Sequence, residues 1–449
     1  MEPIENKKSR LNEFIENPKK SLWKLSLPMM FGMSVQAIYM LVDTAFIGRM
    51  IGGTALASLG YVFPFLFVIM GITFGLGSGA TTLIAQFTGS KNKQNVDNAA
   101  KHTILLGLLI GIIIIIIGFI FGEKLLKMQG AKNEIIVMAI DYFHIMIFGS
   151  IFMILSIFFR SIMSGVGEML FPMKVLGIGT IINIILDPFL IFYYNISGAA
   201  LATIISQIIV TLIFIYFLFF KHASYVSFNF NSFKFNFYII KKIFYLGIPA
   251  SLSMIIMSMG LMLFNNILGT SEAVAAYQTA GRIEHFFFLP IISIATSLVT
   301  LVGMYYGAKR IDLIKIIIKY SIQRSVLIAF CFSLFFFFFI DYLTFIFIDD
   351  KKINELIVLY FKIMAFAYPF ITIGMTSSRV MQGLGYAYPM FILTLFRVVI
   401  ISASLAWYFV IILHKPAHYA WIGTLISCFL TSLFSIFWLK KILNKSITI

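Results

Sequence analysis

The sequence predicts an all-α membrane protein with twelve transmembrane helices. Its composition is the first reason: 60% of the 449 residues are hydrophobic, only 12% are charged, and the mean hydropathy is +0.98. A soluble domain needs a more highly charged surface than this. Apolar runs of about 20 residues, each long enough to cross a bilayer, recur from Leu22 to Leu439. No long polar stretch separates them, so we expect no sizeable soluble domain.

The apolar runs define the boundaries of the predicted spans. In order, they cover residues 22–48, 55–86, 101–122, 135–163, 169–194, 197–220, 238–268, 273–306, 315–347, 354–382, 387–412 and 418–439. Several are longer than a bilayer requires, so we expect some helices to tilt or to project beyond it. The polar start, residues 1–21, predicts a cytosolic amphipathic segment, with a disordered tail as the alternative. It is too acidic for a secretory signal, and no short apolar core with a cleavage site follows.

Basic residues are distributed unevenly between the two sides that the spans define. With the N-terminus in the cytosol, the cytosolic segments hold 24 lysines and arginines and the outer segments hold eight. Cytosolic loops of membrane proteins carry an excess of basic residues. The distribution therefore predicts an even number of spans, with both termini in the cytosol of a prokaryotic-type plasma membrane. It also argues against nucleic acid as a partner, because the net charge of +16 is not gathered in a basic domain.

The two halves of the chain resemble each other at an offset of about 218 residues. The segment AQFTGSKNKQNVDNAAK matches GMYYGAKRIDLIKIIIK, with Gly89 aligned on Gly307, and Pro28 and Pro249 each follow a basic, aromatic-containing segment. An internal repeat of this kind decides the architecture. Six spans per half insert with the same polarity, which predicts two six-helix lobes related by a pseudo-twofold axis along the membrane normal.

The repeat sets the expected domain boundaries, with a central cavity between the lobes. They are a cytosolic segment 1–21, an N-terminal lobe 22–220, a cytosolic inter-lobe loop 221–237 and a C-terminal lobe 238–449. Such an architecture is typical of transporters. A simple channel does not need it.

Two carboxylates interrupt apolar segments of the first half. Asp43 ends the run SLPMMFGMSVQAIYMLVDTAFIG, and Asp187 lies within IGTIINIILDPFLIFYY. A charge inside a bilayer is costly unless it faces protein or water, so such residues indicate a function. Asn183 lies one turn before Asp187, and Thr203 follows in the next span. Carboxylate, amide and hydroxyl oxygens suit Na⁺, and neighbouring desolvated carboxylates could equally carry protons.

Further polar residues share helix faces with these candidates. Gln36, Tyr39 and Met40 lie on the Asp43 face, and Gln207 lies one turn after Thr203. We expect them to line a substrate cavity or to take part in gating.

Pro28, in the first span, and Pro188, directly after Asp187, each remove a backbone hydrogen bond. A proline can therefore kink the first helix.

For Asp43 and Asp187 the alternative role is to cap a helix end near the outer interface.

The second half has no matching pair of carboxylates. It carries Arg282 and Glu284 in the eighth span and Arg397 in the eleventh. Glu284 could line the cavity and attract a cation, or it could simply pair with either arginine. Both interpretations remain open at this point, and Glu284 and Arg397 stay among the cavity candidates.

Motifs of the common enzyme classes are absent. The sequence contains no GxxxxGK[ST], no HExxH and no nucleophile elbow, and its six histidines are scattered. We therefore expect no catalytic residue, no enzyme activity and no cofactor other than transported Na⁺ or H⁺. The glycines Gly71, Gly75, Gly77 and Gly79 predict close helix packing, because no strand precedes them and no Lys-Ser/Thr follows.

As a set, these segments resemble the multidrug and toxic compound extrusion (MATE) family over essentially the whole chain. The resemblance is carried by LPMMFGMSVQAIYMLVDTAFIGR, AQFTGSKNKQNVDNAAK, MSGVGEMLFPM, NIILDPFLIF, GAALATIISQ, GAKRIDLIK and MQGLGYAYPM. It implies twelve helices in two lobes and export of organic cations or amphipathic compounds against Na⁺ or H⁺ entry. It also implies a cation site in the N-terminal lobe formed by Asp43, Asn183, Asp187 and Thr203, with Pro28 in a bending first helix.

Some branches of the family place coupling carboxylates in the seventh and tenth helices. The corresponding segments here, LSMIIMSMGLMLFNNILG and FAYPFITIGMTSSRVMQG, contain none. The resemblance therefore favours the branch that uses the N-terminal lobe.

The expected function is a cation-coupled antiporter that works by alternating access, as a monomer in the lipid bilayer, on a small cationic or amphipathic substrate. The nearest alternative is a lipid-linked oligosaccharide flippase of the related superfamily, which would want a cationic cavity. A membrane-embedded transferase and a channel are the alternatives of other classes.

Overall fold

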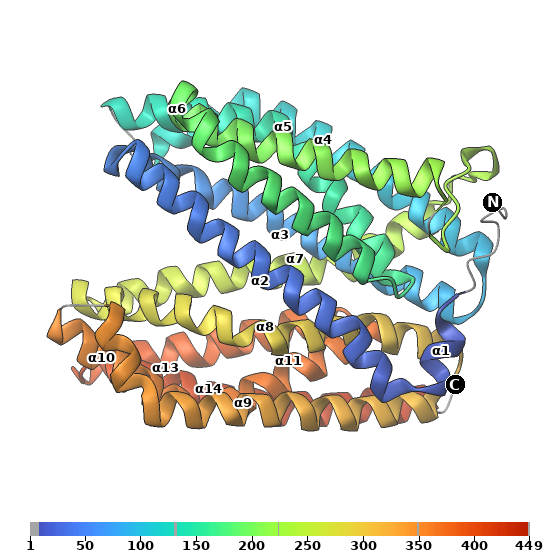
Figure 1. Cartoon of the computed structure of the whole chain (residues 1–449). Coiled ribbons are helices and arrows are strands. Elements are labelled where there is room, and N and C mark those ends of the chain that lie inside the picture. The colour runs from blue at the N-terminus through green and yellow to red at the C-terminus, as the bar shows by residue number, and fades with distance from the viewer. Residues whose placement is uncertain (1–8, 130–132, 223, 348–349, 448–449) are drawn as a thin grey trace. The chain divides into compact units, whose positions relative to one another are not determined.

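A computed structural model describes residues 9–129, 133–222, 224–347 and 350–447 of the chain (Figure 1). Within these residues the regular structure consists of helices, and no strand occurs. This confirms the all-α class. Long apolar segments with good helix formers and few internal breakers favour this outcome, since a helix satisfies its backbone hydrogen bonds within one segment.

The chain packs into two compact units. The first contains Phe31–Ile248 and the described residues before Glu13, and the second contains Glu13–Met30 and Pro249–Ile449. This division follows the two halves of the repeat but differs from the expected lobe boundaries at the start of each half. Helices α2 (Pro18–Met50) and α7 (Phe237–Leu268) therefore each contribute residues to both units.

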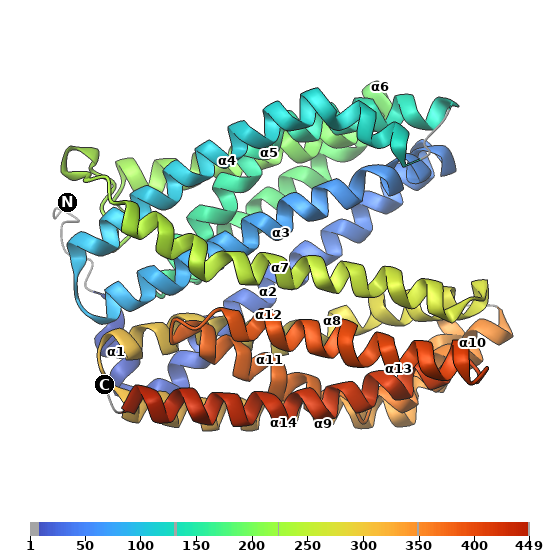
Figure 2. The ribbon, with the colours of Figure 1, turned by 180° about the vertical axis from the view of Figure 1, so that it is seen from behind.

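The first unit is built around its fourth span. Its complete helices are α3 (Gly53–Gly89), α4 (Lys93–Met128), α5 (Asn133–Gly165), α6 (Leu170–Ile215) and the short π-helical continuation η1 (Tyr216–Phe220). Helix α5 packs against α3, α4 and α6, and it lies beside α4 in both views (Figures 1 and 2). This central place explains why α5 is among the most buried of the candidate spans.

Helix α6 is a hairpin of two helices. Asn195 has φ 50° and ψ −133°, which no helical residue adopts, and asparagine tolerates positive φ better than most residues. Three residues later, a Cβ added to Gly198 would collide with the carbonyl group of Leu190, so the chain has doubled back on itself. The arms 170–194 and 196–215 thus match the fifth and sixth predicted spans.

The second unit repeats this plan. It includes the start of α2 and the part of α7 from Pro249 onward, and most of the short helix α1 (Leu11–Glu16). Its complete helices are α8 (Ser271–Gly307), α9 (Ile311–Phe347), α10 (Lys351–Met364), α11 (Tyr368–Gly383), α12 (Tyr388–Leu395), η3 (Phe396–Ala403), α13 (Ser404–Trp407), η4 (Tyr408–Ile412) and α14 (His418–Ile447). Helix α11 packs against α8, α9 and α14, as α5 packs in the first unit.

The number of spans agrees with the sequence prediction. Ten helices of the described chain are long and apolar enough to cross a membrane. Helices α10 and α11, bent by 58° at their junction, together pass the same test and count as one further candidate span. Because the ten include Leu170–Phe220 as a single helix, its division at Asn195 supplies another. The described residues therefore provide the twelve expected spans.

The glycines of α3 permit a very close approach within the first unit. A Cβ on Gly79 would lie 2.5 Å from the carbonyl oxygen of Ile243 in α7, and one on Gly247 would lie 2.7 Å from Cα of Leu76. Both obstacles are backbone atoms, which cannot rotate aside. The structure thus confirms the predicted packing role for Gly79, as small residues do in membrane bundles.

This packing predicts a difference between two glycines of the same helix. Gly79→Ala should lower the free energy of unfolding by about 1–3 kcal/mol, the usual range for overpacking. Gly60→Ala is the matched control, because nothing lies within 4 Å of its added Cβ, and it should be neutral or slightly stabilising. Thermal unfolding in detergent measures both. Equal midpoints for the two variants would contradict the close approach of α3 and α7.

Candidate cation site and transport residues

Asp43 and Asp187 lie together in the first unit. Asp43 is on the C-terminal part of α2 and is 8% exposed, while Asp187 is on the first arm of α6 and is fully buried. Their carboxyl groups lie within hydrogen-bonding reach of each other. Two ionised carboxylates this close repel strongly, so a proton or a cation must lie between them for the arrangement to be stable.

Local helix geometry supplies the next partner. Asn183 and Asp187 are spaced i, i+4 on the first arm of α6, so their side chains meet on one face. The Asn183 amide donates a long hydrogen bond of 3.5 Å to Oδ1 of Asp187, and Asn183 is 2% exposed. Pro188 is accommodated inside this arm directly after the carboxylate. The spacing in the sequence places Asn183 and Asp187 on one face of this arm, and that face is buried in the structure.

Helix α2 also reaches the second arm of α6. The hydroxyl groups of Tyr39 and Thr203 lie 3.1 Å apart and share a hydrogen bond. Tyr39 lies one turn before Asp43 and interacts electrostatically with Asp43 and Asp187. Thr203 thus bonds to a tyrosine that lies within electrostatic range of the carboxyl pair.

Three oxygens of this cluster have no hydrogen-bond partner. They are Oδ1 of Asp43, Oδ1 of Asn183 and Oδ2 of Asp187, all buried in the described structure. A buried acceptor left unpaired costs free energy comparable to its full desolvation. Oxygens of carboxylate and amide groups are the ligands that Na⁺ and other hard cations prefer. The donor set fits a small cation, and the carboxyl pair fits a shared proton equally well.

A residue that the sequence did not single out joins the cluster. Tyr142 of α5 is 3% exposed and interacts electrostatically with Asp43, Asp187 and Tyr39. Its phenol therefore lies within electrostatic range of the carboxyl pair. No pattern in the segment AIDYFHIMIFG marks Tyr142 as more than a core aromatic residue, because its distance from Asp43 in the sequence hides their proximity.

The other predicted cavity residues do not join the buried cluster. Gln36 and Gln207 are half-buried, and Met40 is 50% exposed. Pro28 lies inside α2 three residues before the point where this helix passes from the second unit to the first. These residues keep their expected roles as predictions.

Glu284 forms a separate polar cluster inside the second unit. Its Oε1 accepts a 2.7 Å hydrogen bond from the hydroxyl of Tyr368 on α11, and the Tyr360 hydroxyl of α10 is a second partner. Arg397 acts on Glu284 electrostatically and also interacts with Cys428, whereas Arg282 is exposed. Of the two interpretations, pairing within the unit therefore fits better, and the partners are phenols as well as Arg397.

Comparison with known families decides the identity of this fold. The sequence pattern of the MatE family matches residues 28–189 and again residues 249–408, which together exceed half of the chain. The chain belongs to the MatE family. The two matches begin at Pro28 and Pro249, which confirms the internal repeat. A MatE protein is a transporter and not an enzyme, and this one is an integral membrane protein.

Relatives of this MatE chain are known by name and by structure. It is 28% identical over 326 residues to the probable multidrug resistance protein YoeA of Bacillus subtilis, covering 69% of this chain and 70% of YoeA. It is 28% identical over 332 residues to the multidrug export protein MepA of Staphylococcus aureus, covering 73% of both chains. A solved structure, described as the outward-facing conformation of a multidrug resistance MATE family transporter of the MOP superfamily, superposes with a TM-score of 0.93 at 28% identity. That comparison covers 99% of this chain and all of the solved one.

Proposed function

We propose that this MatE transporter exports organic cations or other amphipathic drugs in exchange for Na⁺ or H⁺. The observation that carries the proposal is the buried pair Asp43 and Asp187. Together with Asn183, the pair contains three oxygens that have no hydrogen-bond partner. A cation or proton bound there changes the charge of the first unit where α2 meets both arms of α6. The relatives, one named as a probable multidrug resistance protein and the other as a multidrug export protein, support the drug-efflux part of the proposal.

Coupling follows from differential binding. An ion drives transport only if it binds one arrangement of the protein more tightly than the other. Asp43 and Tyr39 lie on α2, whereas Asn183, Asp187 and Thr203 lie on α6, so movement between these helices separates the ligands. Ion entry from outside then favours the arrangement that releases substrate outward.

The basic residues support an orientation with both termini in the cytosol. A monomer suffices for this scheme, since one chain carries both units. The alternative of a lipid-linked oligosaccharide flippase would need a cationic cavity for pyrophosphate. Only Arg282 and Arg397 could serve such a cavity, and Arg397 instead interacts with Glu284 and Cys428 within the second unit.

The proposal is tested by transport in proteoliposomes loaded with a lipophilic cation such as tetraphenylphosphonium. An inward Na⁺ gradient at fixed, equal pH is compared with an inward proton gradient in the absence of Na⁺. We expect one of the two gradients to drive export of the probe, and the gradient that does so identifies the coupling ion. If neither gradient drives export of cationic or neutral amphipathic probes, the antiporter assignment is wrong.

A further inference from the structure

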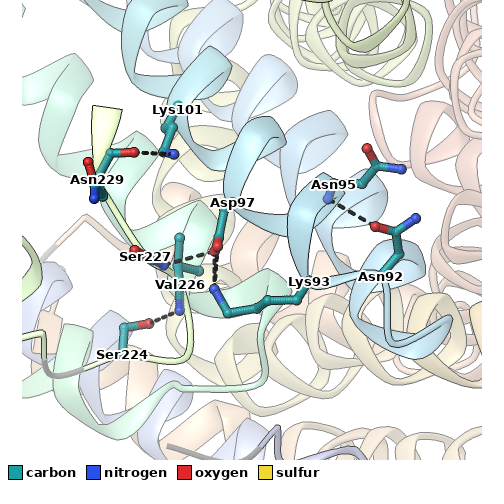
Figure 3. Close-up of polar contacts among 9 residues, drawn as sticks. All are labelled: Asn92, Lys93, Asn95, Asp97, Lys101, Ser224, Val226, Ser227 and Asn229. Atoms are coloured by element: carbon teal, nitrogen blue, oxygen red, sulfur yellow. Dashed lines mark hydrogen bonds and ion pairs between the residues drawn. The ribbon is translucent and has the colours of Figure 1, made fainter. Parts of the chain in front are cut away.

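The linker that joins the two halves lies against the start of α4 (Figure 3). The backbone N–H of Ser227 donates to Oδ1 of Asp97 over 2.8 Å, and Nζ of Lys101 donates to the carbonyl oxygen of Asn229 over 2.5 Å. Lys93 also pairs with Asp97 and lies 5.2 Å from the ring centre of Tyr225. A loop that only connected two helices would not need buried side chains of a neighbouring helix, yet Lys101 is 1% exposed.

The contact continues along α4 to the residue before α7. Asn98 donates to the carbonyl oxygen of Lys234 over 2.8 Å and accepts from its N–H over 3.3 Å. One turn later, Nε2 of His102 accepts a 2.9 Å hydrogen bond from the N–H of Asn236. The other ring nitrogen, Nδ1, lies 2.8 Å from the carbonyl oxygen of Asn98 and must donate to it, because a carbonyl only accepts. His102 is therefore neutral in this arrangement.

These bonds determine where α7 begins. Asn236 immediately precedes the first residue of α7, and its side chain accepts a 2.9 Å hydrogen bond from the N–H of Tyr238. His102 also packs against the rings of Phe233 and Phe235, at centroid distances of 4.9 and 5.7 Å. From this anchor α7 stays with the first unit through Ile248, and from Pro249 it belongs to the second.

An equivalent anchor holds the start of α2 in the second unit. Tyr320 of α9 is 218 residues after His102, the same offset that aligns Gly89 with Gly307. The hydroxyl of Tyr320 accepts a 3.0 Å hydrogen bond from Nε1 of Trp23. Nearby, the hydroxyl of Tyr305 donates over 2.7 Å to the carbonyl oxygen of Phe14, and Tyr305 is fully buried. From this anchor α2 stays with the second unit through Met30, two residues beyond Pro28.

We propose that His102 and Tyr320 are positioning residues for transport. His102 holds the start of α7 on the first unit, whereas α7 from Pro249 onward belongs to the second unit. Tyr320 holds the start of α2 on the second unit, whereas α2 from Phe31 onward belongs to the first unit. Each such helix thereby packs with one unit at its start and with the other unit beyond, and the change of unit lies within three residues of its proline. A change in the arrangement of the units must bend α2 at Pro28 and α7 at Pro249, where a backbone hydrogen bond is already missing. Loss of an anchor would let the whole helix start move instead. This inference rests on the proposed alternating-access function.

The test separates the acceptor of His102 from its ring packing. His102→Phe keeps an aromatic ring against Phe233 and Phe235 but removes the acceptor, and His102→Gln keeps an acceptor. Asn92→Ala is the matched control, since Asn92 caps the same helix by accepting from the N–H of Asn95 over 3.1 Å, at the edge of the cluster in Figure 3. Trp23→Phe removes the donor to Tyr320 at the second anchor.

Two measurements are made on the full chain in proteoliposomes. Hydrogen–deuterium exchange of peptides within 224–240 should be about five- to tenfold faster in His102→Phe, the effect of losing one hydrogen bond. Gradient-driven efflux should show a maximal rate about fivefold lower with an unchanged KM for substrate. His102→Gln should restore much of both values, Asn92→Ala should change neither, and Trp23→Phe should lower the maximal rate similarly.

Each outcome decides a separate point. Unchanged linker exchange in His102→Phe, or faster exchange with an efflux rate within twofold of the wild type, would overturn the positioning role. If His102→Phe does not fold, Trp23→Phe decides, and an efflux rate within twofold of the wild type in that variant would overturn the positioning role. If the wild-type protein shows no gradient-driven efflux, the proposed function fails, while the exchange experiment still tests whether His102 holds the linker.

Discussion

Asparagine at position 43 or 187 is expected to abolish ion-driven efflux while leaving the protein folded. Coupling between an ion and a substrate is typically worth a 5- to 150-fold change in affinity. Without one carboxylate the cluster loses the repulsion that a cation or proton relieves, so this factor should fall to about one. Substrate affinity, measured with and without the driving ion, gives the factor directly for Asp43→Asn and Asp187→Asn.

A neighbouring carboxylate provides the control for this prediction. Asp141 is exposed and lies directly before Tyr142, so it shares the helix that contributes to the site without being buried in it. Asp141→Asn should keep wild-type coupling. If Asp43→Asn and Asp187→Asn both retained gradient-driven efflux, the buried pair would not be the coupling site. If Asp141→Asn lost it as well, the effect would reflect surface charge rather than the cluster.

Much of the membrane architecture follows from local properties of the chain. Apolar runs of sufficient length, the distribution of basic residues and the repeat at Gly89 and Gly307 are each visible without three-dimensional information. The unit with which the start of α2 or α7 packs, in contrast, does not follow from local properties of the chain. The first residues of each half, 22–30 and 238–248, pack with the other half of the repeat, and side-chain contacts such as Trp23 with Tyr320 contribute to this. Hydropathy cannot detect such contacts.

The candidate site was predictable only where its residues repeat at helical spacing. Asn183 and Asp187 are one turn apart, and Tyr39 and Asp43 are one turn apart, so each pair could be placed on a face. That the two faces meet depends on the reversal at Asn195 and on the packing of α2. Tyr142 joins from α5 with no periodic partner, so only packing shows its proximity.

Glu284 illustrates the opposite case, in which the sequence left two roles open. A half-buried carboxylate that accepts a hydrogen bond from the Tyr368 hydroxyl has less need of a cation than a buried one with unpaired oxygens. The Asp43 and Asp187 pair keeps unpaired oxygens, whereas Glu284 has hydrogen-bond partners in the hydroxyl groups of Tyr368 and Tyr360. The two halves thus share a fold but differ in how their buried acids are compensated.

The α6 hairpin holds the candidate cation ligands together as well as stabilising the fold. A single methyl group added at Gly198 should therefore lower the stability and weaken ion binding. Its Cβ would overlap the backbone carbonyl of Leu190 and lie 2.7 Å from the nitrogen of Ile191. Gly198→Ala is therefore expected to cost about 3 kcal/mol of unfolding free energy, the upper end for overpacking. The arms would separate where the first carries Asp187 and the second carries Thr203, so the cation ligands would separate too.

Ion-dependent stabilisation distinguishes this effect from simple loss of stability. At an ion concentration 100 times its Kd, the wild-type protein should gain about 2.7 kcal/mol, seen as a higher unfolding temperature. Gly198→Ala should unfold at a lower temperature and gain much less from the ion. Gly177→Ala, on the first arm of α6 with nothing within 4 Å of its added Cβ, should retain the full gain. A Gly198→Ala protein that is destabilised but keeps the full gain would show that the site does not depend on the closed hairpin. The link between the turn at Asn195 and the position of Asp187 would then have to be abandoned.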